Sequence, residues 1–345
     1  MNNILKIQER CVGCRSCEQS CPKHCISFVE DKEGFLYPEV DDKKCIECKI
    51  CLKVCPCENA KLHRSTPKKV WAWKSTKSAD VMRSASGGAA DSAAKTVLEM
   101  NGVVYGAAYD EKFVVSHIEV TDDEDRKKIQ SSKYVQSDLK DCYTKIKKWL
   151  TQNRKVLFTG CPCQVAGLYA FLGGDKNNLY TIDLICHGVP SPKFLEYQSE
   201  KNGGQVNYLN FRSKDKKGWS TRIKIKTKKK TMEMPLVLDR YGKHFMEGDC
   251  YRESCYQCEF ANINRVGDIT VGDFWGIIKS HPHFYSAKGV SSVFVNTIKG
   301  QWLFQNMENQ ADTENATLEE CLVGQENLTK SSIRPVNRDW FYEMI

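Results

Sequence analysis

The feature that most constrains this chain is a cysteine run that occurs twice near the N-terminus. Residues 11–22 read CVGCRSCEQSCP and residues 45–56 read CIECKICLKVCP, so both follow the spacing C-x2-C-x2-C-x3-C-P. Ten of the 18 cysteines in the 345 residues fall between positions 11 and 57. The opening MNNILKIQER lacks the apolar segment of a secretory signal. We therefore expect a reducing compartment, in which these thiols bind metal rather than form disulfides.

The repeated spacing resembles the signature of bacterial two-cluster ferredoxins. Three closely spaced thiolates hold one 4Fe–4S cluster, while the fourth thiolate, before the proline, reaches the other cluster. The resemblance assigns one cluster to Cys11, Cys14, Cys17 and Cys55, and the other to Cys45, Cys48, Cys51 and Cys21. Paired C-x2-C motifs also build zinc sites, but two full copies with the trailing proline favour iron–sulfur. Cys25 and Cys57 fall outside the pattern and are predicted to be small buried residues.

Length and composition indicate a soluble, cytoplasmic protein of about two or three domains. Hydrophobic residues make up 41% of the chain, and no apolar run approaches the ~18 residues of a membrane span. The formal net charge is +8. Much of this excess lies in KDKKG (214–218) and KTKKK (226–230), which are interpreted as solvated hairpin tips. No nucleic-acid partner is expected, because basic charge without a reading motif is weak support for one.

Four regions are predicted along the chain. Residues 1–64 form a ferredoxin-type unit whose two runs are joined by a hairpin, and residues 65–78 form a linker that packs at one point. Residues 79–155 and 156–345 form the two parts of a second domain. In this domain, apolar strands alternate with helical stretches, which is typical of an α/β core.

The predicted elements of the second domain are a helix within 86–100, a strand at 102–109, a helix at 138–152, and strands at 155–160 and 179–186. After residue 200 the pattern changes. Residues 220–239 alternate apolar and charged positions, as in an antiparallel hairpin with one wet face. The sheet is therefore predicted to be mixed, and the fold class to lie between α/β and α+β.

A second group of cysteines follows the repeat. Cys163 comes after the strand at 155–160, Cys186 ends the strand at 179–186, and Cys255 and Cys258 form another C-x2-C pair. Thiols at the carboxyl ends of two strands can converge at one edge of a sheet. The spacing alone leaves two interpretations, a third metal site or ordinary buried cysteines.

Several motifs around these cysteines resemble the beta subunit of the deazaflavin coenzyme (F-420) hydrogenases and dehydrogenases. They are TGCPCQVAGL (159–168), YTIDLICHGVPSP (180–192), SCYQCEFA (254–261), RVGDITVGDFWGI (265–277), SASGGAA (84–90) and SKYVQSD within 131–138. The resemblance covers roughly residues 75–345. It is closest to bacterial members that carry an N-terminal two-cluster ferredoxin domain, and it extends to a plant chlorophyll-derivative reductase.

The resemblance implies a bound FAD and a third 4Fe–4S cluster. Its ligands would be Cys163, Cys186, Cys255 and Cys258, with Cys250 as a competing choice. Cys161 is an extra thiol at a position where relatives often have none. The fourth ligand of this cluster is therefore left open.

Three segments are candidates for flavin contacts. Ser86, Gly87 and Gly88 open a helix, so their N–H groups suit a diphosphate, although the same residues make an ordinary N-cap turn. In the second segment, Lys133 would balance phosphate or reduced-flavin charge and Tyr134 would pack on a ring, unless the segment is a surface turn. The remaining candidates are Ser137, Gly160, Pro162 and Gln164. No G-x-G-x-x-G follows a strand, so NAD is disfavoured as the direct hydride partner.

Three polar residues near these motifs have two interpretations each. His187 is a candidate proton donor to flavin or substrate, or it forms a structural hydrogen bond. Asp268 and Asp273 would orient a cluster or flavin loop through backbone N–H groups, or act as ordinary aspartates at a strand end.

Together these expectations describe an FAD- and 4Fe–4S-dependent oxidoreductase. It would pass electrons between a ferredoxin or another redox protein and a small two-electron organic substrate. The substrate, a deazaflavin or another acceptor, and the direction of flow are left open, as is self-association. The alternative function is a non-enzymatic electron-relay subunit of a larger redox complex.

Overall fold

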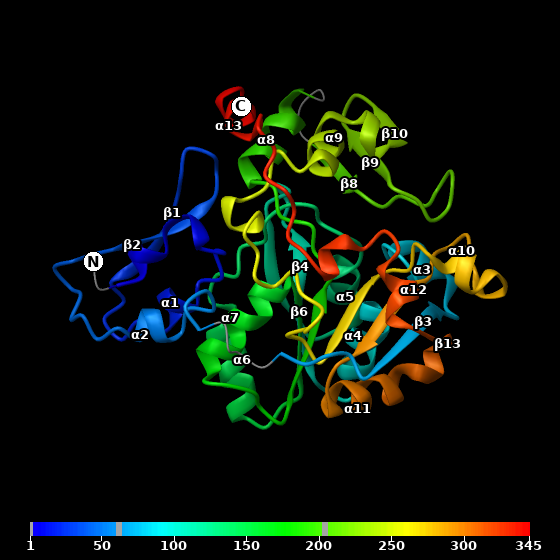
Figure 1. The fold of residues 1–345 in the computed structure, drawn as a ribbon, viewed down its shortest axis with the longest axis horizontal. Helices are drawn as coiled ribbons and strands as arrows, with labels where there is room; N and C mark the ends of the chain where they lie inside the picture. Colours follow the sequence, from blue (N-terminus) through cyan, green and yellow to red (C-terminus); the bar gives the residue numbers. More distant parts are fainter. Residues whose placement is uncertain (1–2, 60–63, 202–205) are drawn as a thin grey trace.

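A computed structural model describes residues 3–59, 64–201 and 206–345 of the chain (Figure 1). Its largest sheet has eight strands in the order β13-β3-β12-β11-β7-β6-β4-β5. The strands are β3 (Lys69–Ser75), β4 (Val103–Tyr109), β5 (Val115–Val120), β6 (Val156–Gly160), β7 (Leu179–Leu184), β11 (Ile269–Asp273), β12 (Ser291–Val295) and β13 (Ala311–Ala316). The central strands β4, β6, β7 and β11 are parallel, and the strands on both sides pair antiparallel. The predicted mixed sheet is confirmed.

Helices cover both faces of this sheet because its central strands are apolar on both sides. On one face α4 (Ala89–Glu99) and α11 (Ile298–Met307) pack on a core that includes Val104. On the other face α6 (Cys142–Thr151) and α7 (Pro162–Leu172) pack on a core that includes Val103. The shorter helices α3 (Ser78–Arg83), α5 (Asp123–Ile129), α10 (Ile277–Ser280) and α12 (Leu318–Leu322) complete the body.

The segment 65–78, expected to be a linker, contains β3, so the structure differs here. β3 pairs with β12 on one side and β13 on the other. The reason is visible in its alternation: Val70 and Ala72 pack into one core, whereas Trp71 and Trp73 pack into the core on the opposite face. A strand with two apolar faces belongs inside a covered sheet.

A second, three-stranded sheet stands apart from the large one. It consists of β8 (Val206–Asn210), β9 (Arg222–Thr227) and β10 (Thr231–Pro235). It packs with α8 (Pro192–Lys201), α9 (Arg240–Glu247) and α13 (Arg338–Glu343) around its own core. The predicted hairpin is therefore present. We had expected it to belong to the mixed sheet, but it forms part of this separate sheet.

The N-terminal residues form a separate lobe, on the left in Figure 1. Its elements are η1 (Ile4–Arg10), α1 (Ser16–Gln19), the hairpin β1 (Ile26–Glu30) and β2 (Leu36–Val40), and α2 (Ile50–Lys53). The core of this lobe consists mainly of cysteines. None of the helices in the described residues is long and apolar enough to cross a membrane.

Arginines fasten the lobe to the body. Arg252, 1% exposed, donates from Nε to the Cys11 carbonyl (2.6 Å), from Nη1 to Gln136 Oε1 (3.0 Å) and from Nη2 to the Leu36 carbonyl (3.0 Å). Arg338 forms a two-pronged ion pair with Glu33, at 3.0 and 2.7 Å. Hydrogen bonds to a buried charge are strong, so the lobe is held in one position.

Candidate functional site

The first predicted cluster site of the lobe is enclosed. Its four thiols, those of Cys11, Cys14, Cys17 and Cys55, are all buried. Burial, followed by the charge of Cys55, raises the pKa of Cys14. The neighbouring Cys57 side chain lowers the pKa of Cys55 to about 7. Four converging buried thiols fit a cluster, since thiolates are its ligands.

The second predicted site is a hollow. Its wall carries the four expected thiols, those of Cys21, Cys45, Cys48 and Cys51. Cys48 is exposed, and the other three are wholly or partly buried. A cavity lined by four thiols is the shape a cubane requires, so the residues present fit a 4Fe–4S cluster here as well.

The two cysteines outside the ferredoxin pattern lie against its ligands. Cys25 is buried, as expected, and its Sγ lies 3.3 Å from Cys21 Sγ. Cys57 is only half-buried, which differs from the prediction, and its Sγ donates to the Arg10 carbonyl (3.2 Å). Each predicted cluster site of the lobe therefore has a fifth thiol beside it.

The third set of cysteines comes from separate parts of the chain. Cys163 lies in the first turn of α7, Cys186 lies two residues after β7, and Cys255 and Cys258 lie in and after η3 (Glu253–Cys255). Burial, followed by the charges of Cys258, Cys186 and Cys255, raises the pKa of Cys163. The structure thus brings together the four thiols that the family resemblance selected, and their role as ligands stays a prediction.

Cys161 and Cys250 are the competing thiols, and the structure separates them. A hydrogen bond from Cys161 lowers the pKa of Cys186, so Cys161 reaches the third set. Cys250 is fully buried in the core around the small sheet, and its carbonyl accepts from Tyr342 Oη (2.6 Å). The geometry favours Cys161 over Cys250 as the fifth thiol of this set.

A buried ion pair joins the segment before Cys186 to the segment after Cys258. Arg265 donates from Nη2 to Asp183 Oδ1 (2.9 Å), and both residues are at most 2% exposed. The second oxygen of Asp183 accepts from the N–H groups of residues 266 and 267, at 3.0 and 2.8 Å. Burial raises the pKa of Cys258, and the Arg265 guanidinium opposes that effect, as a cation beside a thiolate does.

The first and third sets approach each other across α7. A Cβ atom added at Gly167 would lie 2.8 Å from Cys14 Cβ and 2.9 Å from Cys14 Sγ. Glycine at this position therefore allows the lobe to contact the helix that also carries Cys163. The charge of Cys14 also raises the pKa of Cys163. Its effect is smaller than that of burial and of the charges of the other three thiols of the set.

The predicted flavin loop is tightly packed at the start of α4. Gly87 N donates to Ser291 Oγ (2.9 Å), and a Cβ atom on Gly87 would lie 2.1 Å from the Trp73 carbonyl. Gly88 has φ +88°, which glycine adopts without strain. No side chain caps α4, and its first residue, Ala89, is 1% exposed. A buried, uncapped helix N-terminus leaves N–H groups that suit an anion.

Lys214 and Lys133 lack an ion-pair partner within the described residues, and Lys214 contacts this loop. Lys214, 3% exposed, donates to the carbonyls of Val81 and Ser86, both at 2.7 Å. Lys133 donates to three backbone carbonyls of residues 128–131. Burial lowers the pKa of each lysine to about 7. Desolvated cations without a carboxylate partner fit an anionic group that supplies the missing charge.

Lys214 is a residue that sequence reasoning missed, because the run KDKKG was interpreted as solvated. Asp215, Lys216 and Lys217 are exposed as expected, but Lys214 is not. The adjacent Ser213 Oγ is buried without a hydrogen-bond partner, as is Tyr109 Oη beside Lys133. The only hint in the sequence was that the run begins four residues after the end of strand β8.

Tyr134 and Asp273 take part in one network. Tyr134 stacks on Phe245 (centroids 4.3 Å apart, 11°), and its Oη accepts from Arg212 Nη1 (3.3 Å). Arg212 also donates to both oxygens of Asp273 at 2.7 Å, and Trp219 Nε1 donates to Asp273 Oδ1 (2.7 Å). This buried pair fixes the carboxyl end of β11, beside the end of β7 that leads to Cys186.

The four other candidates for flavin contacts are Ser137, Gly160, Pro162 and Gln164. His117 Nε2 donates to the Thr159 carbonyl (2.9 Å), so its Nδ1 accepts from Ser137 Oγ (2.8 Å); burial lowers the pKa of His117 to about 4, which keeps it neutral. Gln164 Oε1 accepts from Cys161 N (2.9 Å) in the capping box of α7. Gly160 and Pro162 form the turn into that helix. The side chains of Ser137 and Gln164 are thus engaged within the protein, and cofactor contacts from Gly160 and Pro162 stay predictions.

The structure favours different kinds of interpretation for His187 and for Asp268. The His187 ring forms no hydrogen bond with any described residue, so the structural interpretation is not supported. Its side chain reaches solvent, yet the surrounding protein desolvates the imidazole and lowers its pKa. Asp268, 1% exposed, accepts from Thr181 N (3.0 Å) and Thr297 Oγ1 (2.5 Å), which fits the interpretation as an ordinary structural aspartate.

Comparisons with known families agree with this division of the chain. Residues 153–320 match the C terminus of the family described as "Coenzyme F420 hydrogenase/dehydrogenase, beta subunit", and residues 10–59 match "4Fe-4S dicluster domain". An uncharacterized ferredoxin of Methanocaldococcus jannaschii is 33% identical over 66 residues, which are 19% of this chain and 84% of that protein. A ferredoxin of Escherichia coli is 32% identical over 77 residues, with the same two coverages, 19% and 84%.

The fold has a counterpart among solved structures. A chain in the F420-reducing NiFe hydrogenase complex from Methanosarcina barkeri superposes with a TM-score of 0.54 and 18% identity, over 77% of this chain and 90% of that chain. At this identity the likeness is one of fold. Both family matches lead to one conclusion: the chain is an iron–sulfur redox protein that carries, over residues 153–320, the C-terminal domain of the coenzyme F420 hydrogenase/dehydrogenase beta subunit family, with a two-cluster 4Fe–4S domain before it.

Proposed function

We propose that this chain is an iron–sulfur flavoprotein oxidoreductase. It passes electrons between a one-electron carrier such as a ferredoxin and a two-electron organic substrate. A bound FAD would supply the chemistry that the side chains lack, because a flavin exchanges electrons singly with clusters and in pairs with organic molecules. Cys163, Cys186, Cys255 and Cys258 would hold the third cluster.

The observation that carries this proposal is a cationic, carboxylate-poor region at the edge that bears the third cysteine set. The backbone of Val271 in β11 pairs with Leu184 in β7, so Asp273 and Cys186 follow neighbouring parallel strands at the same edge. Arg212 neutralises Asp273, and Lys214 and Lys133 keep unmatched charge. An anionic dinucleotide would balance these lysines beside the thiols.

The residues of the region have separate tasks in this proposal. The uncapped N-terminus of α4 and Lys214 would bind the diphosphate, and Lys133 would balance further negative charge. Tyr134 is held by Phe245 and Arg212, so it would act as a fixed wall rather than a mobile ring. His187 is neutral at pH 7 because its pKa is lowered, and a neutral imidazole is better suited to accept a proton than to donate one.

Anaerobic counts of iron, sulfide and flavin test the proposal. After reconstitution with iron, sulfide and FAD, we expect about twelve irons and one FAD per chain, which corresponds to three cubanes and a flavin. About eight irons and no flavin would instead favour the non-enzymatic relay. The family description names coenzyme F420, so a deazaflavin is the first substrate to test with the loaded protein.

A further inference from the structure

The two cysteine sets of the lobe differ in what surrounds them. α1, in the first run, contacts α7 and α6 of the body, whereas α2, in the second run, packs against α1. Figure 1 shows the same order, with α1 between α2 and α7. The first set is thus covered by the body, and the second set lies on the outer side of the lobe.

The second set is also the one that reaches solvent. Among the eight cysteines of the ferredoxin pattern, Cys48 alone is exposed. The loop 41–49 is exposed at every position except Cys45, which is partly exposed. An electron carrier that approaches from solvent therefore finds a thiol of this set before any thiol of the first.

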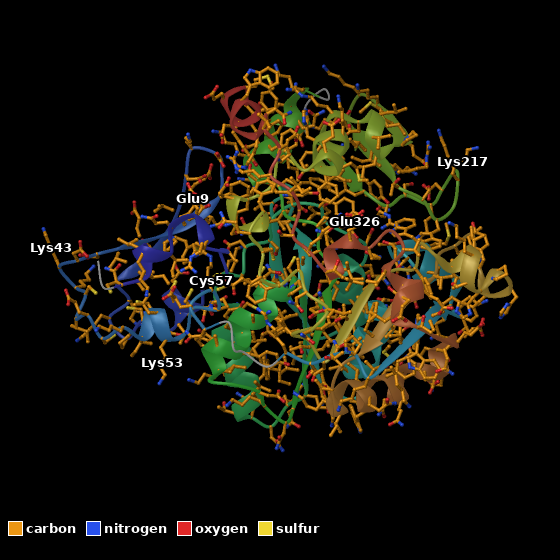
Figure 2. The ribbon with its side chains drawn as sticks, in the orientation of Figure 1. Glu9, Lys43, Lys53, Cys57, Lys217 and Glu326 are labelled. Carbon is orange, nitrogen blue, oxygen red and sulfur yellow. The ribbon has the colours of Figure 1, made fainter. Side chains whose placement is uncertain are left out.

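Lys23 and Lys49 line the same hollow as Cys48, and Lys43, Lys44 and Lys53 lie near Cys48 in the sequence. We define the tip surface as the exposed residues Lys23, Lys43, Lys44, Ile46, Lys49 and Lys53. The same loop contains Asp41, Asp42 and Glu47, and Asp41 pairs with Lys44 at 2.9 Å. The other four lysines form no ion pair with any described residue, and the five lysines outnumber the three carboxylates of the loop by two, so the side chains here have a small net positive charge. Figure 2 shows Lys43 at the far end of the lobe and Lys53 at its lower edge.

The tip surface also has an apolar centre. Ile46, between Cys45 and Glu47, is 57% exposed. Protein contact surfaces combine an apolar centre with a polar rim, and charges of opposite sign steer the encounter and raise its rate. Small, weak contacts of this kind are typical of electron-transfer pairs.

We propose that the tip surface is the docking site for a small, negatively charged one-electron carrier protein. The inference rests on the proposed function in one respect, that Cys21, Cys45, Cys48 and Cys51 hold a redox cluster. One electron passes between the carrier and this cluster, so one of them is oxidised and the other reduced. No bond forms or breaks.

Stopped-flow reduction by a reduced, acidic two-cluster ferredoxin tests the docking site. The readout is the bleaching of the lobe clusters in the full chain, which requires no flavin. At low salt, Lys43→Glu/Lys53→Glu should lower the second-order rate constant by about tenfold or more, since electrostatic steering contributes about 10- to 1,000-fold. The rate of the wild-type chain should fall as salt is added, and that of the variant should change little.

The turn between β9 and β10 provides the matched control. Lys228 and Lys230 are exposed there, far from the lobe (Figure 1), and Lys228→Glu/Lys230→Glu makes the same change in charge. This control should keep the wild-type rate. Dithionite, which needs no protein contact, should reduce all three proteins equally, which shows that the clusters are intact.

The outcomes separate the docking site from the proposed function. Equal slowing by both pairs, or no slowing by Lys43→Glu/Lys53→Glu, would overturn the docking site. A salt-independent wild-type rate would also overturn it. A chain that docks the ferredoxin as described but binds no FAD would overturn the flavin part of the proposed function and leave the docking site standing. Ile46→Ser should slow reduction with no change in salt dependence, since it removes an apolar contact alone.

Discussion

The lobe and the body assemble their cysteine sites in different ways. In the lobe, each site takes three thiols from one short run and a fourth from the other run. In the body, the third set takes Cys163 from a helix start, Cys186 from beyond a strand, and Cys255 and Cys258 from a loop. The lobe sites therefore depend on local spacing, whereas the third set depends on the order of β6, β7 and β11 in the sheet.

The largest expected effect separates the two kinds of site. Cys255→Ser/Cys258→Ser should lower the iron content from about twelve to about eight per chain, because a 4Fe–4S cluster needs its thiolates. The electron paramagnetic resonance signals of the reduced lobe clusters should persist. Cys142→Ser, at a buried cysteine outside all three sets, is the control and should keep all the iron. Loss of the lobe signals in the double variant would show that the lobe is not independent.

Lys214 and Lys217 sharpen the comparison, because Lys214 is buried and Lys217, in the same run of sequence, is exposed. Lys214→Met should weaken FAD binding about ten- to a hundredfold, as expected for the loss of a charge-assisted hydrogen bond. Lys217→Met should leave the affinity unchanged. Flavin fluorescence titrations measure both. Equal affinities for the two variants would remove Lys214 from the flavin site.

The same lysines predict a pH dependence. Burial lowers the pKa of Lys133 and Lys214 to about 7, and the protonated form is the one that attracts a diphosphate. FAD affinity should therefore be greatest below pH 7 and decrease as the pH rises above 7, by up to about tenfold per unit for each lysine. Lys214→Met should make this slope shallower. An affinity that rises with pH would contradict the assignment.

Arg252 tests how firmly the lobe is held. Arg252→Ala removes three hydrogen bonds from a buried guanidinium, so the free energy of unfolding should fall by about 3 kcal/mol or more, since hydrogen bonds to charged groups contribute ~1.5–3 kcal/mol each. Arg334→Ala removes a partly exposed ion pair with Glu253 and should cost less than about 1 kcal/mol. Urea denaturation of both variants compares them. A small effect for Arg252→Ala would mean that the lobe is loosely attached.

The smallest expected effect concerns the fifth thiol of the third set. Cys161→Ala should keep the iron count but shift the spectrum or the midpoint potential of the third cluster, because it removes the hydrogen bond to Cys186. Cys250→Ala should leave both unchanged and lower stability alone, because Cys250 is a core residue. If Cys250→Ala loses iron instead, the assignment of the two thiols is reversed.

Much of the lobe and part of the body could be predicted from the sequence. The repeat selected two sets of four thiols, and the structure groups the same thiols around an enclosed site and a hollow. Helices and strands with clear periodicity, such as α4, α6, β4 and β6, lie where we expected them. Two predictions were wrong. β3 was expected in a linker but pairs within the large sheet, and the β9–β10 hairpin was expected in that sheet but forms part of the small one. Which strands pair depends on partners far along the chain, and local pattern contains no such information.

Side-chain roles divide in the same way. The sequence by itself determined which residues offer thiolate ligands at close spacing and which positions have the backbone freedom of glycine, because both properties follow from the covalent structure of the chain. Only the tertiary structure decided that Lys214 is buried while Lys217 is solvated, that Gln164 caps α7, and that Cys161 contacts Cys186 whereas Cys250 lies in the core around the small sheet. Burial and distance to a neighbour depend on the packing of separate segments, and this packing sets the pKa and the available partners of each group.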